Sequence, residues 1–148
     1  MSVQTKPPIA AGSNRNFSFT LATDAPDQIW RLWTTPASWA DWDQGLKSAR
    51  QEGEMALGSV GQIVPLFGLT CRFEVVKFEA GRGYGFVTHL PLATLRVDRF
   101  FNGDRSAFTH LVTFAGPMAF LFSRLFGPGF RKALPASMIA LSARAGAI

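Results

Sequence analysis

The chain has 148 residues and a net charge of +5, and 47% of its residues are hydrophobic, including 14 phenylalanines and 4 tryptophans. Only 17% are charged, so the composition excludes an intrinsically disordered chain and suits one domain with one core. No apolar run reaches the roughly 20 residues that span a bilayer, and residues 1–14 lack the apolar core of a secretory signal. The one cysteine, Cys71, excludes an intramolecular disulfide and fits a reducing compartment, so we expect a cytoplasmic protein.

The positive charge is concentrated towards the C-terminus. Residues 1–104 contain ten basic and ten acidic side chains, which cancel. The excess consists of Arg105, Arg124, Arg131, Lys132 and Arg144. A basic segment can bind nucleic acid or an anionic membrane, but no RNP-type or zinc-finger motif accompanies these charges. We therefore favour a solvated helix face, expect no nucleic-acid partner, and keep membrane contact by residues 118–144 as a minority interpretation.

The chain begins with a polar segment and a first strand. Residues 1–14 contain proline and glycine, so we expect a flexible tail ahead of a single domain over 15–148. Residues 16–22 alternate large apolar side chains with small or polar ones, which predicts a strand. Asp24 is a suitable N-cap for the helix that follows, and Pro26 fits its first turn.

Two helices rich in tryptophan follow this strand. Pro36 ends the first helix, because the residue before a proline avoids the α conformation, and begins a second short helix over 36–42. The two helices carry all 4 tryptophans of the chain, for which a core position is the default expectation. Trp39 and Trp42 could instead gate the mouth of a cavity. Asp41 and Asp43 lie on the exposed side of the second helix, where we expect them to increase solubility.

From residue 46 the pattern predicts strands until the last helix. The expected strands cover residues 46–55, 60–67, 69–78, 84–90, 94–101 and 107–115. Glycine, proline and asparagine separate them, most clearly in the turn at 102–104. Together with the first strand they form a curved antiparallel sheet, and its apolar face needs a cover.

The last segment, residues 118–144, is the element that can provide this cover. Its Gly-Pro-Gly sequence at 127–129 predicts a break that divides it into two helical pieces. The second piece carries a helical stripe of Phe130, Leu134, Met138 and Leu141. Pro135 predicts a kink or a helix start near it. The expected fold is therefore α+β, a curved seven-stranded antiparallel sheet (β-α-α-β6-α) wrapped around a long C-terminal helix, with an internal cavity.

Several segments carry a family resemblance. They are residues 29–33 with Trp39 and Trp42, residues 57–61, residues 109–112, Gly116-Pro117, and Leu134-Pro135. In this order they resemble the helix-grip, START-like superfamily (SRPBCC), specifically its polyketide cyclase/dehydrase and lipid-transport group. The resemblance covers residues 15–145 and implies a hydrophobic cavity between sheet and helix. It does not imply one chemistry, because members of the superfamily bind, carry or cyclise different molecules.

Hairpin pairing predicts which side chains share the inner face of the sheet. The turn around residue 91 places Tyr84 opposite Arg99, and the next turn, pairing residues 101 and 106, places Val97 opposite His110. The resulting face is mostly apolar, so we expect it to line the cavity. The candidate cavity residues are Cys71, Phe73, Tyr84, Phe86, Thr88, Val97, Arg99, Phe108, His110, Val112, Phe130, Leu134 and Met138.

We predict neither a metal nor a cofactor. A site built from Cys71, His89, Asp98 and His110 would need ligands from both faces of the sheet, and no HxxxH or CxxC spacing supports it. A one-residue slip in register would exchange the two histidines between the faces. No P-loop, GxGxxG or Ser-His-Asp order indicates an NTPase, a dinucleotide enzyme or a covalent hydrolase.

Arg99, His110 and Tyr84 are the candidate catalytic residues. Arg99 on an apolar face must pair, reach solvent or bind an anionic ligand group. His110 could act as a general acid or base, or be a core histidine. Since the inner face is mostly apolar, we predict binding, extending to transport, of a hydrophobic or aromatic small molecule. The alternatives are a metal-free polyketide aromatase/cyclase-type enzyme and a peripheral lipid-handling protein; oligomeric state is left open.

Overall fold

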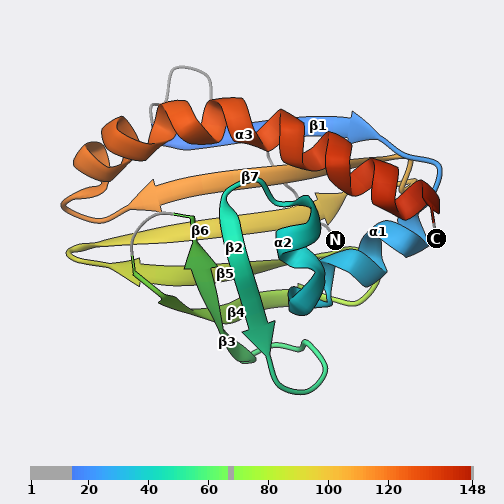
Figure 1. The fold of residues 1–148 in the computed structure, drawn as a ribbon, viewed down its shortest axis with the longest axis horizontal. Coiled ribbons are helices and arrows are strands. Elements are labelled where there is room, and N and C mark those ends of the chain that lie inside the picture. Colours follow the sequence, from blue (N-terminus) through green and yellow to red (C-terminus); the bar gives the residue numbers. More distant parts are fainter. Residues whose placement is uncertain (1–14, 67–68, 148) are drawn as a thin grey trace.

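The computed structural model describes residues 15–66 and 69–147. Its elements are β1 (Asn16–Ala22), α1 (Pro26–Trp33), η1 (Pro36–Ser38), α2 (Trp39–Trp42), β2 (Leu46–Gln51), β3 (Val60–Pro65), β4 (Cys71–Glu79), β5 (Gly83–Leu90), β6 (Ala93–Phe101), β7 (Ala107–Ala115) and α3 (Ala119–Ala147). The strands form one seven-stranded antiparallel sheet in the order β1-β7-β6-β5-β4-β3-β2, which curves around α3 (Figure 1). The predicted curved seven-stranded sheet around a long C-terminal helix is confirmed, whereas the internal cavity stays a prediction. The tail expected over 1–14 lies outside the described residues.

The helices after β1 differ in detail from their prediction. Asp24 does not cap α1; Ala25 occupies the cap position and makes no side-chain cap hydrogen bond. Instead, the hydroxyl of Thr23 accepts a hydrogen bond from the Ala25 backbone N–H at 3.0 Å. The second short helix begins as a 3₁₀ turn at Pro36 and becomes α-helical only from Trp39.

The predicted register is confirmed between β5 and β6, where Tyr84 lies opposite Arg99. Between β6 and β7 the predicted register is wrong by two residues: Arg99, and not Val97, lies opposite His110. The turn is wider than expected, since Asn102 N–H donates to the Ala107 carbonyl at 3.0 Å and Arg105 adopts a left-handed φ of 59°. A shift of two residues keeps every side chain on its predicted face, because the strand repeat is about two residues.

The helix α3 is one continuous helix of 29 residues, so the predicted break at 127–129 is wrong. Pro128 and Pro135 both lie inside it, and Figure 1 shows that the helix bends along its length. Gly127 is required for packing and not for a break: a Cβ atom there would lie 2.6 Å from the Phe17 ring. Contact with the sheet therefore holds a segment helical that local propensity would interrupt.

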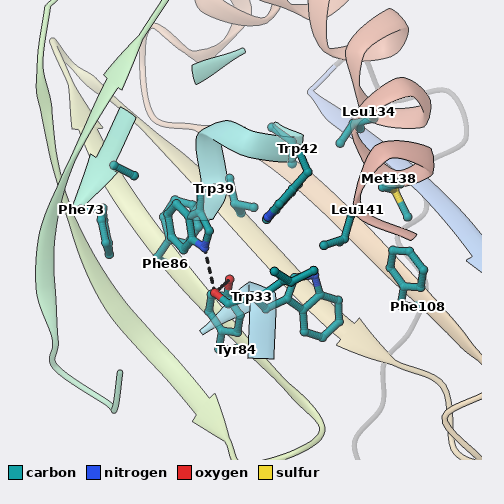
Figure 2. Close-up of a cluster of buried hydrophobic side chains, with 14 of the residues drawn as sticks. Trp33, Trp39, Trp42, Phe73, Tyr84, Phe86, Phe108, Leu134, Met138 and Leu141 are labelled. Carbon is teal, nitrogen blue, oxygen red and sulfur yellow. Dashed lines mark hydrogen bonds between the residues drawn. The ribbon is translucent and has the colours of Figure 1, made fainter. Parts of the chain in front are cut away.

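The two halves of α3 cover different parts of the concave, inner face of the sheet. Residues 131–147 pack with α1 and α2, whose tryptophans fill the space between them (Figure 2). Ser137 on this half accepts a hydrogen bond from the Gln44 backbone N–H at 2.9 Å, just beyond α2. Residues 119–130 lie over β1 and β7, and Gly127 touches Phe17. No helix in the described part of the chain is long and apolar enough to cross a bilayer.

Candidate functional site

Arg99 is the centre of a polar network in the core. It lies on the inner face of β6, between Tyr84 on β5 and His110 on β7, and is only 3% exposed. Its Nη1 donates to the Tyr84 hydroxyl at 2.7 Å, and that hydroxyl donates to the Trp33 carbonyl at 2.8 Å. The structure thus brings the three candidate catalytic residues together. Burial raises the pKa of Tyr84 to about 12 although the Arg99 charge lowers it, so the phenol keeps its proton at neutral pH.

Aromatic rings surround the Arg99 guanidinium. Its central carbon lies 4.5 Å from the Trp39 ring centroid, 4.9 Å from that of Trp42 and 5.3 Å from that of Phe86. A desolvated guanidinium over aromatic faces gains about 2 kcal/mol per good contact. The aromatic faces and the Tyr84 hydroxyl together offset the free-energy cost of removing the Arg99 charge from water.

Asp43 is the acidic partner of Arg99, and the prediction that it only increases solubility missed this role. Its Oδ2 lies 3.8 Å from Arg99 Nη2, and its side chain is 24% exposed. Burial raises the pKa of Asp43, while the Arg99 charge and the Gly45 N–H act to lower it. Sequence spacing alone could not pair residues 43 and 99. Asp41, by contrast, lies at the surface, with its Oδ2 3.3 Å from Arg144 Nη2.

His110 is a hydrogen-bond acceptor in the core. Its Nε2 accepts a hydrogen bond from the Trp33 indole N–H at 2.9 Å. Burial, with a smaller contribution from the Arg99 charge, lowers the pKa of His110 well below its usual 6.5. The imidazole is therefore neutral at pH 7, and the Trp33 contact assigns its proton to Nδ1. Because Trp33 occupies the Nε2 lone pair, that nitrogen is not available to take a proton from a substrate.

Three tryptophans close this network off from solvent. Trp33, Trp39 and Trp42 are at most 1% exposed, and the Trp39 indole N–H donates to the Trp33 carbonyl at 2.9 Å (Figure 2). We call the part of the inner face that these rings cover the tryptophan end. A substrate could reach Arg99, His110 and Tyr84 only if the indoles moved. The network joins Trp33 at the end of α1 and Asp43 just after α2 to side chains of the sheet.

Some buried polar atoms on the inner side make no hydrogen bond. Thr88 Oγ1, Trp42 Nε1 and Arg99 Nε are fully buried without a partner, and Figure 2 shows the Trp42 indole nitrogen pointing into the cluster. Buried polar groups are nearly always paired, with protein, water or ligand. Trp42 Nε1 and Arg99 Nε lie within the tryptophan end, so of these three atoms only Thr88 Oγ1 lies towards the less covered part of the inner face.

The inner face is less covered at the end of the sheet that carries Leu90 and Leu95. Cys71, Leu90, Leu95, Phe122 and Phe130 face or pack against the core but remain partly exposed. We call this set the open end. Leu95 pairs with Phe114, whose ring contacts that of Phe130 at 5.9 Å. Burial raises the pKa of the Cys71 thiol, and this thiol donates to the Leu69 carbonyl at 3.3 Å, so nothing activates it as a nucleophile.

The predicted cavity residues divide between the two ends. Those that are buried are Phe73, Tyr84, Phe86, Thr88, Val97, Arg99, Phe108, His110, Val112, Leu134 and Met138. Cys71 and Phe130 are partly exposed. His89 is exposed on the outer face, and Asp98 on that face pairs with Arg96 at 2.9 Å. Among the described residues, no three His, Cys, Asp or Glu side chains lie close enough together to hold a metal ion.

A pocket of about 400 Å³ lies elsewhere, where residues 119–130 cross the edge strand β1. Its lining residues are Arg15, Phe17, Phe120, Ser123, Arg124, Gly127, Pro128 and Arg131. None of them was a predicted cavity residue. The excess of basic residues near the C-terminus was the one feature of the sequence that indicated this pocket. The sequence could not show that Arg15 lies beside them.

Comparisons with known proteins show the fold and no more. No protein-family model matches the chain, and no curated protein matches it. Several solved structures match the chain in fold. Protein jhp0584 from Helicobacter pylori is 11% identical with a TM-score of 0.67, covering 98% of this chain and 99% of its own. Protein TTHA0849 from Thermus thermophilus is 14% identical with a TM-score of 0.66, covering 89% and 97%. DynU16, from the dynemicin biosynthetic locus, is 15% identical with a TM-score of 0.59, covering 86% of this chain and 46% of its own.

Proposed function

We propose that this protein binds a hydrophobic or aromatic small molecule at the open end, between the inner face of the sheet and residues 119–130 of α3. One observation carries the proposal: apolar side chains that face the inside of the fold, such as Leu95 and Phe130, stay partly exposed there. Covering them with a ligand would gain roughly 25 cal/mol for each Å² of apolar surface removed from water.

Thr88 indicates what the ligand should carry. Its side chain lies beside Leu95 and Phe73 in the cross-strand pairing, and its buried hydroxyl has no partner. A hydroxyl both donates and accepts, so one polar atom on an otherwise apolar molecule would satisfy it. The ligand we infer is therefore mainly apolar, with one hydrogen-bonding group at its inner tip.

Binding is favoured over the cyclase alternative by the hydrogen bonds that the polar side chains already make. A cyclase would need polar side chains within hydrogen-bond reach of its substrate. Arg99, His110 and Tyr84 are committed by hydrogen bonds to one another and to Trp33, whereas the Thr88 hydroxyl has no partner. The proposal agrees with the START-like resemblance and with a structural neighbour from a biosynthetic locus, although a shared fold does not select a chemistry.

The test is titration with an uncharged, environment-sensitive dye such as Nile red, together with native mass spectrometry of the purified protein for a co-purifying ligand. Leu95→Gln should weaken dye binding about tenfold, equivalent to ~1.4 kcal/mol. Leu111→Gln is the matched control, because Leu111 is also partly exposed but lies on the outer face of β7. We expect it to change affinity less than about twofold, within ~0.4 kcal/mol.

Two results would contradict the proposal. One is the absence of saturable dye binding by the wild-type protein together with the absence of a co-purifying ligand. The other is an equal loss of affinity in Leu95→Gln and Leu111→Gln, which would mean that the dye does not distinguish the two faces of the sheet. Thermal melting of both variants checks that each is folded.

A further inference from the structure

The outward side of residues 119–130 exposes large apolar side chains. Phe120, Leu121, Leu125 and Phe126 are each between 37% and 63% exposed. On the other side of this helical segment, Ala119, Ser123 and Gly127 are buried. Successive residues of an α-helix are about 100° apart, so Leu121 and Leu125 point away from that buried ridge. Four large apolar side chains within seven consecutive residues indicate an interaction surface, because monomers rarely leave such clusters in water.

The same surface is positively charged. The α3 segment contains no acidic residue, and Arg124, Arg131 and Lys132 are all exposed. Across residues 15–66 and 69–147, none of these three forms an ion pair. The guanidinium carbon of Arg131 lies 5.0 Å from the Phe17 ring centroid, so this side chain is held against β1 at the rim of the surface. A cluster of cations without acidic partners, next to exposed apolar side chains, fits a partner that is both anionic and apolar.

The pocket at β1 adds a place for an anionic group. Arg15, Arg124 and Arg131 line it, and Phe120 belongs both to its lining and to the exposed apolar set. Its volume of about 400 Å³ is enough for a phosphate with attached atoms. Guanidinium groups match phosphate oxygens with two parallel hydrogen bonds, so arginine is well suited to this task.

We propose that residues 119–130 dock the protein onto an anionic lipid bilayer. Phe120, Leu121, Leu125 and Phe126 enter the boundary between headgroups and acyl chains, and a lipid phosphate occupies the β1–α3 pocket. Amphipathic helices with cations beside their apolar face bind membranes in this way, and each cation near an anionic surface strengthens binding about fivefold. This docking uses the outward side of the helix and does not depend on the proposed ligand at the open end.

Other partners fit this surface less well. A second copy of the chain would bring two sets of Arg124, Arg131 and Lys132 together with no carboxylate on either helix. Nucleic acid would match the charge but would leave the exposed leucines and phenylalanines in water. Only a bilayer supplies negative charge and apolar volume side by side.

The experiment is co-sedimentation with vesicles of phosphatidylcholine alone or mixed with phosphatidylserine, at low and high salt. Wild type should bind the anionic vesicles at least tenfold more tightly than the neutral ones, and added salt should weaken binding. Arg124→Gln/Arg131→Gln should lose about thirtyfold, as expected for two cations at about fivefold each. Lys47→Gln/Arg72→Gln is the charge-matched control, since both residues are exposed and lie on β2 and β4, away from the β1 edge of the sheet that residues 119–130 cross, and it should lose less than threefold.

A second pair of variants tests insertion. Leu121→Gln/Leu125→Gln should reduce binding to anionic vesicles at least tenfold, whereas Leu57→Gln, which changes a leucine that is 68% exposed between β2 and β3, should not. In Phe126→Trp, the fluorescence of the introduced indole should shift to shorter wavelength only when anionic vesicles are added. Because these positions are exposed, the variants should melt within a few degrees of wild type.

Several outcomes would overturn the proposal. Equal binding to neutral and anionic vesicles, or none to either, would exclude an anionic bilayer as the partner. Dimerisation in analytical ultracentrifugation that Leu121→Gln/Leu125→Gln abolishes, without vesicle binding, would assign the surface to a second copy. Saturation of the arginine pocket by free phosphate, with no effect of vesicles, would reduce it to a site for soluble anions.

Discussion

The tryptophan end and the open end lie on the same concave face of one sheet, but their side chains are covered to different degrees. At the tryptophan end, Trp33, Trp39 and Trp42 fill the space between the sheet and residues 131–147, and polar groups bond to one another. At the open end, residues 119–130 bring phenylalanines that contact the sheet without completely covering it. The difference shows that one face of a sheet can be tightly packed at one end and remain partly open to solvent at the other.

The largest expected change in stability comes from removing an aromatic ring, and the loss should differ between the two ends. Trp33→Ala should lower the free energy of unfolding by about 3–5 kcal/mol, because it leaves a core cavity and removes the N–H that His110 accepts. Phe130→Ala at the open end should cost only about 1–2 kcal/mol, since that ring is already partly exposed. Urea unfolding measures both. Equal losses would contradict the division into a packed end and an open end.

The pH dependence of stability should come from the tryptophan end. The folded-state pKa of His110 lies below its unfolded value of about 6.5, so the unfolded chain binds a proton that the folded protein does not. Stability is then complete above about pH 6.5 and decreases as the pH falls below it, by up to about 1.4 kcal/mol per pH unit. The Arg99 charge beside His110 acts in the same direction, whereas the raised pKa of Asp43 opposes it at more acidic pH.

His110→Gln should abolish this slope between about pH 5 and pH 6.5, because glutamine can accept the Trp33 hydrogen bond but does not ionise in this range. His89→Gln, on the exposed outer face, is the matched control and should keep the slope. Urea unfolding at a series of pH values is the measurement. A slope that survives His110→Gln would show that another group titrates.

The smallest expected change in stability should come from a substitution at the boundary between the two ends. Thr88→Val replaces a buried hydroxyl that has no partner, so it should raise the free energy of unfolding of the ligand-free protein by about 1 kcal/mol. Thr109→Val on the outer face removes a hydrogen bond to Thr20 of 2.7 Å and should lower stability by up to about 1 kcal/mol. Thermal melts compare the two. Destabilisation by Thr88→Val would show that its hydroxyl already has a partner, such as a bound water.

Local patterning was enough to predict the existence of the strands and the face on which their side chains lie, although β2 ends at Gln51 and not at residue 55. Alternation of apolar and polar residues is a local property, so Tyr84, Arg99 and His110 were assigned to one face even though the register of β7 differed by two residues. Their burial followed from the apolar neighbours on that face.

Features that depend on contacts between distant segments could not be predicted in this way. Gly127 and Pro128 predict a break, but packing of Gly127 against Phe17 keeps α3 continuous. Asp43 pairs with Arg99, and Arg15 joins Arg124 and Arg131 around one pocket, only because the fold brings these elements together. Short-range propensities of about 1 kcal/mol per residue are weaker than the burial of a core ring, so packing prevails wherever the two conflict.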